Sequence, residues 1–167
     1  MNAEKCTLSF VNDNIVFYKF TNGGKRITKT SNGWTEGVYV NRFITDLPTF
    51  SVKIMQLETF NFGIYEGVEV DSSHYTLQLY GNSWCYYGGR DFGYIIDHLR
   101  LTPTGVETPP NSTVTVSVNL ENKTISYKID GKSVGTPQSV KLVDSEFLLL
   151  RPIVQMEYVG DSVEIYP

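Results

Sequence analysis

Hydrophobic and polar side chains alternate along much of the chain, most strictly over residues 113–120, where every second residue is Val or Leu. Successive side chains of an extended strand point to opposite faces, so this pattern predicts a strand with one face in a core and the other in water. The alternation resumes over 124–129 after a short turn at 121–123. Asp130-Gly131 then supplies a residue pair typical of a tight hairpin turn. We therefore predict a β-meander from residue 113 onward.

Other segments have the same two-residue period and are separated by Gly, Asn and Asp. They are residues 14–20, 50–57, 75–80, 153–158 and 162–166. The last two flank Gly160-Asp161, which predicts a closing hairpin. Residues 94–101 are compatible with a short helix or with a strand that ends at a loop over 102–112. No segment keeps a helical period over helical length, so the strands and their spacing predict an all-β sandwich or barrel.

The composition supports β structure, because 13% of the residues are aromatic and aromatic side chains favour pleated, half-buried surfaces. The length of 167 residues predicts a single domain, which we take to span 1–167.

The formal charge of −4 and the scattered Lys and Arg residues remove the electrostatic drive for nucleic-acid binding. No apolar run approaches the ~20 residues that span a bilayer, and the N-terminus lacks the pattern of a secretory signal. We expect a cytoplasmic or nuclear protein with Cys6 and Cys85 reduced, and with neither nucleic acid nor membrane as a partner.

Candidate catalytic and metal-binding residues are sparse. Asp97 and His98 are sequence neighbours, and on a strand they point to opposite faces, which makes a poor acid–base pair. The two His and two Cys residues have no metal-ligand spacing, and the acidic turn at Asp144 and Glu146 is isolated. We therefore expect no enzyme activity, no cofactor and no metal.

The densest group of aromatic residues lies between positions 84 and 94. Alternation predicts that Trp84 and Tyr86 point to one face of a strand and Tyr87 to the other. Tyr, Trp and Arg side chains anchor protein interfaces because they combine rigid area with a polar tip. Two interpretations stay open: the rings fill the core, which we prefer for Trp84, or the rings beyond the turn form a binding surface with Arg90.

Several segments resemble the SPRY domain, a β-sandwich recognition module. The most specific is 118–135, Val-Asn-Leu-Glu-Asn-Lys-Thr-Ile-Ser-Tyr-Lys-Ile-Asp-Gly-Lys-Ser-Val-Gly, which resembles the family's Leu-Asp-x-x-x-x-Thr-Ile-x-Phe-x-x-Asn-Gly-x-x-x-Gly hairpin. The other segments are Phe50-Ser-Val-Lys, Phe62-Gly-Ile, Asn82-Ser-Trp-Cys-Tyr-Tyr-Gly-Gly-Arg, Leu150-Arg-Pro-Ile-Val and Gly160-Asp-Ser-Val-Glu-Ile. The resemblance covers residues 37–166, with departures from the family pattern at Asn119, Arg151 and Cys85. Residues 1–36 would then supply flanking strands.

The resemblance implies a bent antiparallel β-sandwich of concanavalin-like architecture and a noncatalytic role in protein–protein interaction. Family members serve as substrate receptors in ubiquitin-ligase assemblies and as scaffolds, so the expected partner is a protein or peptide. Such partners dock on loops at one end of the sandwich. The candidate contact residues on these loops are Tyr39, Arg42, Tyr86, Tyr87, Arg90, Asp91, Phe92, Lys128 and Asp130.

The alternative function is that of a carbohydrate-binding sandwich of lectin-like architecture. Exposed Tyr or Trp rings would stack on sugar faces, and Asn82 or Asp91 would bind hydroxyl groups. Both functions use exposed rings, so the sequence leaves the choice to experiment.

Overall fold

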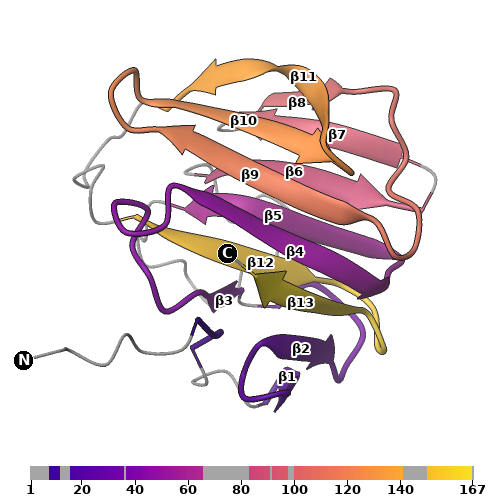
Figure 1. Ribbon diagram of the computed structural model, residues 1–167. Coiled ribbons are helices and arrows are strands. Elements are labelled where there is room, and N and C mark those ends of the chain that lie inside the picture. Colours follow the sequence, from indigo (N-terminus) through magenta and orange to yellow (C-terminus); the bar gives the residue numbers. More distant parts are fainter. Residues whose placement is uncertain are drawn as a thin grey trace, which may run out of the picture.

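The computed structural model describes residues 8–11, 16–35, 37–65, 83–90, 92–97, 100–140 and 150–166. These residues form two antiparallel sheets packed face to face, and they include no helix (Figure 1). The seven-stranded sheet has the order β1 (Tyr18–Thr21), β2 (Arg26–Lys29), β13 (Ser162–Tyr166), β4 (Thr49–Gln56), β9 (Thr113–Asn119), β10 (Thr124–Ile129) and β11 (Lys132–Ser139). The six-stranded sheet has the order β3 (Val38–Tyr39), β12 (Arg151–Met156), β5 (Thr59–Tyr65), β6 (Ser83–Gly89), β7 (Phe92–Asp97) and β8 (Arg100–Pro103). The predicted all-β sandwich is confirmed.

The core lies between the two sheets and is built from the apolar positions of the alternating strands. In β9 and β10 the residues at even positions of 114–118 and at odd positions of 125–129 are buried, as the sequence predicts. Aromatic rings join the sheets, because Phe50 of β4 packs edge-on against Phe62 of β5 with ring centres 5.4 Å apart. Tyr86 of β6 and Tyr127 of β10 make a tilted contact with ring centres 6.3 Å apart. Such pairs add about 0.5–1.5 kcal/mol each beyond the apolar area they bury.

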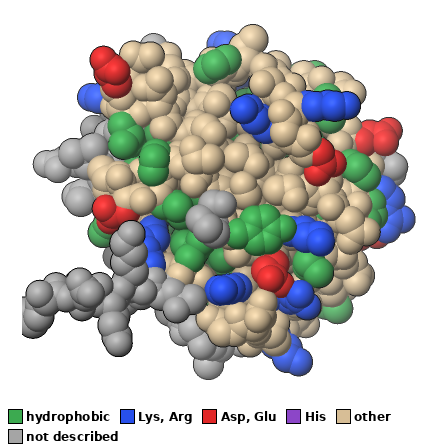
Figure 2. Space-filling view, viewed as in Figure 1, with side chains coloured by type: hydrophobic (Ala, Val, Ile, Leu, Met, Phe, Trp, Pro, Cys, Tyr) green, Lys and Arg blue, Asp and Glu red, His purple; other side chains and the backbone are tan. Residues whose placement is uncertain are grey.

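The outer face of the seven-stranded sheet is polar and mostly uncharged. The hydroxyl groups of Ser51 on β4 and Thr115 on β9 lie 2.8 Å apart, and Thr49 donates to the hydroxyl of Ser117 at 3.4 Å. Figure 2 views this face, and over β4, β9 and β10 few of its side chains are hydrophobic or charged. The middle of this face therefore offers no large apolar surface to a partner.

The predicted closing hairpin is wrong. β12 pairs with β3 and β5 in one sheet, whereas β13 pairs with β2 and β4 in the other, so residues 157–161 carry the chain between the sheets. The buried carboxylate of Asp161 holds this passage: it accepts hydrogen bonds from the backbone N–H groups of Glu58 at 2.9 Å and Thr59 at 3.2 Å. Residues 57 and 58 connect β4 to β5, so the two places where the chain changes sheet are fastened to each other.

Of the segment over 94–101, whose sequence is compatible with a helix or a strand, residues 94–97 belong to β7 and residues 100 and 101 to β8. The expected loop over 102–112 begins inside β8, and Thr108 and Ser112 within it are buried. From the first 36 residues, β1 and β2 form one edge of the seven-stranded sheet. Buried Tyr18 accepts a hydrogen bond at its hydroxyl from the backbone N–H of Met156 in the opposite sheet. The expected strand over 75–80 and the acidic turn over 144–146 lie outside the described residues.

The buried Asp161 carboxyl predicts a characteristic pH dependence of stability. Burial raises its pKa from 3.8 to about 6. The folded protein therefore binds the Asp161 proton more tightly than the unfolded chain, and the stability from this proton, complete below pH 3.8, is lost as the pH rises through 6. Relative to Asp161→Asn, we expect the free energy of unfolding of the wild type to fall by about 1–2 kcal/mol from about pH 4 to about pH 7. Urea denaturation of both proteins across this range measures the difference, and a difference that rises with pH contradicts the prediction.

Candidate functional site

The predicted contact loops lie at two opposite ends of the sandwich. At one end, which we call the β6–β7 end, Thr59 of β5 pairs with Gly89 of β6. Asp130 of the β10–β11 turn belongs to this end too, because its N–H donates to Thr113, the first residue of β9, which pairs with β4 near the β4–β5 connection. At the other end, the β3 end, Arg151 of β12 pairs with the last residue of β5, and Tyr39 ends β3.

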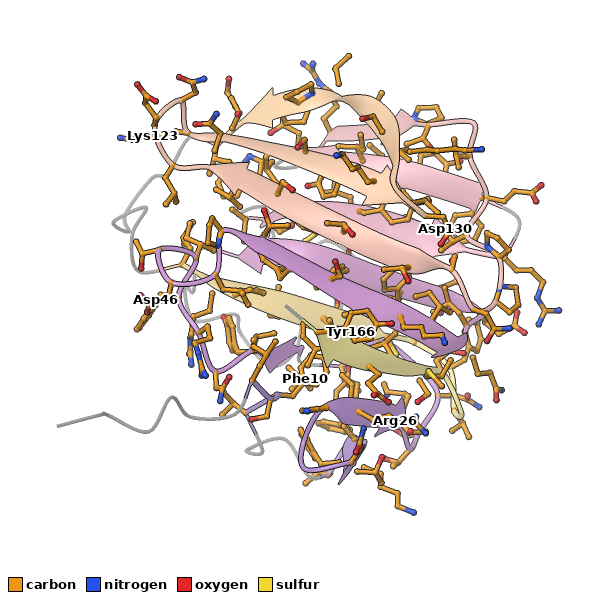
Figure 3. The ribbon with its side chains drawn as sticks, viewed as in Figure 1. Phe10, Arg26, Asp46, Lys123, Asp130 and Tyr166 are labelled. Carbon is orange, nitrogen blue, oxygen red and sulfur yellow. The ribbon has the colours of Figure 1, made fainter. Side chains whose placement is uncertain are left out.

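The prediction that all three loops share one end is therefore wrong. Figure 3 shows the separation, with Asp46 and Lys123 on one side of the molecule and Asp130 on the other. The sequence pattern shows which segments are loops, but the end at which a loop lies depends on the order in which strands cross between sheets. The two ends have to be considered as separate sites.

At the β6–β7 end, four aromatic side chains form a connected group on the outer face of the six-stranded sheet. We call this group the aromatic patch, and it consists of Trp34, Tyr87, Phe92 and Tyr94. Tyr87 is at its centre, with ring centres 4.9 Å from Phe92, 5.9 Å from Tyr94 and 6.2 Å from Trp34. All four side chains are only partly buried. The patch therefore presents rigid aromatic surface to solvent, stabilised by its own ring contacts.

Glycines in the β6–β7 hairpin make room for these rings. A Cβ on Gly89 would stand 2.5 Å from the Phe92 ring and 2.6 Å from the Glu58 carbonyl oxygen. On the inner face, a Cβ on Gly88 would stand 2.5 Å from the Thr108 hydroxyl. Both approaches are too close for a side chain, so Gly89 leaves room for the Phe92 ring beside Tyr87, and Gly88 leaves room for Thr108 in the core.

Charged groups border the patch. Arg90 in the β6–β7 turn forms an ion pair with Glu58 at 3.2 Å, and both side chains are more than half exposed, so the pair contributes little to stability. Glu157 accepts a hydrogen bond from the Thr59 hydroxyl at 3.1 Å. The pKa of Tyr87 is raised, first by burial and then by the neighbouring Glu157 carboxylate and the hydroxyl groups of Tyr158 and Tyr94.

The structure separates the predicted residues of this region into core and surface. Tyr87, Arg90 and Phe92 are at least partly exposed. The prediction that Tyr86 contacts a partner is wrong: its ring is 0% exposed and its hydroxyl is hydrogen-bonded to that of Thr108 at 2.8 Å. Alternation along β6 already places Tyr86 on the core side. Asp91 lies outside the described residues.

Trp34 is the patch residue that sequence reasoning missed. It is 53 positions before Tyr87 in the chain and lies in a segment without alternation. The N–H of Gly33 donates to the carbonyl oxygen of Glu157 at 2.7 Å, which anchors this segment against the end of β12. Only the pairing of distant segments brings Trp34 to Tyr87, so no local signal marks it.

The β3 end carries a different arrangement. The guanidinium of Arg151 lies over the Tyr39 ring at 4.5 Å and within 6.0 Å of the Phe43 ring. Arg42, partly buried, donates to the carbonyl oxygen of Asn41 at 3.0 Å. At the β3 end, the rings of Tyr39 and Phe43 therefore already have a cation–π contact with Arg151 of the same chain.

Two further predicted residues lie in the β-meander. Lys128 on β10 is exposed on the outer face of the seven-stranded sheet. Asp130 is exposed at the β10–β11 turn, where it adopts a φ of 49° and accepts a hydrogen bond from the N–H of Thr113 at 2.8 Å. This hydrogen bond ties the β10–β11 turn to the start of β9, so the position of the carboxylate already has a structural explanation.

Neither a metal cluster nor a membrane-spanning helix is found within the described residues. No group of three or more His, Cys, Asp or Glu side chains there could hold a metal ion. Among the same residues, no helix is long and apolar enough to cross a membrane. His74, His98 and the candidate sugar-binding residues Asn82 and Asp91 lie outside this part of the chain.

Three solved structures with a similar fold are SPRY domains. A human SPRY domain matches at a TM-score of 0.63 with 16% sequence identity, covering 90% of this chain and 94% of that one. The TRIM65 PSpry domain matches at 0.66 with 10% identity, covering 96% and 92%, and the SPRY domain of human HERC1 at 0.54 with 17% identity, covering 89% and 91%. No protein-family model and no curated protein matches the sequence. The fold is that of a SPRY domain, as the sequence motifs predict.

Proposed function

We propose that this chain is a noncatalytic protein-interaction module that binds a protein or peptide through the aromatic patch. The observation that carries the proposal is the group of four partly exposed rings around Tyr87, bordered by the exposed Arg90. Tyr, Trp and Arg are the side chains most enriched among residues that dominate binding energy.

The scaffold beneath the patch suits recognition. Tyr87 and Tyr94 lie opposite each other on paired strands, and their rings are stacked at an interplanar angle of 22°. Because the strands hold these rings in place before a partner arrives, little conformational entropy is lost on binding. A surface of this kind would serve a substrate receptor in a ubiquitin-ligase assembly or a scaffold equally well, and the identity of the partner distinguishes these roles.

The double substitution Tyr87→Ala, Arg90→Ala tests the site. We expect it to abolish recovery of the partners that the wild type captures, since it removes the central ring of the patch and its neighbouring cation. The unfolding transition should change little for the Arg90 substitution, because exposed ion pairs are worth about 0–1 kcal/mol. Captured proteins are identified by affinity purification and mass spectrometry, with the thermal unfolding of each variant measured in parallel.

The matched control is Tyr39→Ala, Arg42→Ala, which removes the same residue types from the β3 end. Recovery of the partners should be unchanged in this variant. Equal recovery by the wild type and the Tyr87, Arg90 variant would refute the proposal. Loss of the partners after enzymatic removal of their glycans would instead support carbohydrate binding.

A further inference from the structure

Three groups of aromatic rings in the described residues differ in their cation–π contacts. Buried Lys29 lies over the rings of Phe17 and Tyr18, with its ammonium nitrogen 5.7 Å from each ring centre. Arg151 lies over Tyr39 at the β3 end. The aromatic patch is a group of four partly exposed rings, yet among the described residues no Lys or Arg side chain lies over them. The face of an aromatic ring is electronegative and attracts cations, so the patch has an unused capacity to bind one.

A carboxylate close to Tyr87, that of Glu157, increases this capacity. The Glu157 carboxylate and the hydroxyl groups of Tyr94 and Tyr158 are close enough to make ionisation of Tyr87 less favourable. These groups come from β7, from the end of β12 and from the passage between the sheets, so their convergence depends on the tertiary fold. Burial is the largest cause of the raised pKa of Tyr87 and disfavours charge of either sign. The next cause is the Glu157 carboxylate, which would stabilise a cation placed beside the ring.

Glu157 differs from the neighbouring Glu58 in its partners. Glu58 is paired with Arg90, whereas no ion pair of the described residues involves Glu157. Its one described hydrogen-bond donor is the neutral hydroxyl of Thr59. Within the described residues, the Glu157 carboxylate thus has no cationic partner, and together with the partly exposed rings near it, it can form a cation site.

We propose that the aromatic patch binds an arginine side chain in a basic segment of the partner protein, with Glu157 as the counter-ion. Arginine is favoured over lysine because its planar guanidinium can stack on a ring while its N–H groups donate to a carboxylate. Arg151 on Tyr39 shows that this chain already supports such stacking. The net charge of −4 also favours approach of a basic segment. The inference rests on the proposed function, since it specifies what the partner offers to the same patch.

The test uses Trp34 as a reporter. The chain has two Trp residues, and Trp84 is 1% exposed in the core, so a ligand at the patch should move only the Trp34 indole N–H resonance. Trp34→Phe assigns that resonance. The 167-residue chain labelled with ¹⁵N is titrated with the acetylated, amidated peptide Gly-Ser-Arg-Ser-Gly, and in parallel with peptides carrying citrulline or lysine in place of arginine. Citrulline has the shape of arginine without its charge.

We expect saturable shifts with the arginine peptide and binding about tenfold weaker with the citrulline peptide, as fits the range measured for cation–ring attraction. The affinity of the lysine peptide should lie between those of the arginine and citrulline peptides. Glu157→Gln should weaken arginine binding by about three- to tenfold, while the matched control Glu121→Gln, in the exposed β9–β10 turn at the other end, leaves it unchanged. Added salt should weaken binding of the arginine peptide more than that of the citrulline peptide.

Equal affinity for the arginine and citrulline peptides, absence of any shift, or an unaltered affinity of Glu157→Gln would overturn the inference. Affinity purification of partners with the patch variants distinguishes failure of the arginine site from failure of the proposed function. A partner that is lost with Tyr87→Ala, Arg90→Ala but retained with Glu157→Gln would leave the interaction site standing and refute the arginine site.

Discussion

Gly63→Ala is expected to destabilise the protein by about 3 kcal/mol or more, because a side chain at this position has no space at all. Gly63 lies in the middle of β5, opposite Cys85 of β6. A Cβ there would stand 2.7 Å from the Cys85 Cα and would collide with the Trp84 carbonyl oxygen. Both obstacles are backbone atoms of a central strand, so relief requires β5 and β6 to separate. Urea denaturation followed by circular dichroism measures the loss.

Gly131→Ala is the matched control. A methyl group on Gly131, in the β10–β11 turn, would meet no atom within 4 Å, but the φ of 80° at this position strains any other residue. Its cost should stay near the ~1–2 kcal/mol of a left-handed backbone. A Gly63→Ala protein as stable as the Gly131→Ala protein would show that β5 and β6 do not pair in this register.

Asp161→Ala should cost about 3 kcal/mol, because it leaves two buried or partly buried backbone N–H groups, those of Glu58 and Thr59, without their acceptor. Each lost acceptor leaves a donor that water reaches poorly at this junction. The free energy of unfolding at neutral pH measures the effect. Since the β4–β5 connection and the β12–β13 passage share this carboxylate, both sheets should loosen together and the transition should remain two-state.

Two variants calibrate this result. Asp161→Asn keeps one oxygen acceptor, so its free energy of unfolding should lie between those of the wild type and Asp161→Ala. Asp46→Ala removes an exposed carboxylate at the β3 end and should change stability by less than about 0.5 kcal/mol. If Asp161→Ala is no less stable than Asp46→Ala, the carboxylate does not fasten the two passages.

The sequence predicts individual strands well where one face is buried and the other wet. The alternation over 113–129 marks β9 and β10 and the faces of their residues, because local period and tertiary burial agree there. It also separates Tyr87 from Tyr86 on β6, although the family resemblance alone would include Tyr86 among the contacts. The SPRY motifs identify the architecture because they combine such strands with turn residues.

The sequence does not determine which sheet receives a strand. β12 and β13 have the pattern of a hairpin, yet they lie in different sheets, since a short turn and a short passage have the same composition. The same ambiguity underlies the wrong prediction that Tyr39 and Arg42 lie at the end of the sandwich where Tyr87 lies. Trp34 joins Tyr87 only through the anchoring of residue 33 to the end of β12. These relations are non-local, and alternation carries no information about them.

The junction beside the aromatic patch limits how such a surface can diversify. Glu58 and Thr59 bind Asp161 through their backbones, while their side chains contact Arg90 and Glu157 at the border of the patch. These bonds need residues 58 and 59 to keep their backbone path, so only side chains that leave this path unchanged can be accepted there. Tyr87, Arg90 and Phe92 of the β6–β7 hairpin are at least partly exposed and make no hydrogen bond to Asp161. New specificities would therefore arise most readily at Tyr87, Arg90 and Phe92, with the junction retained as a common frame.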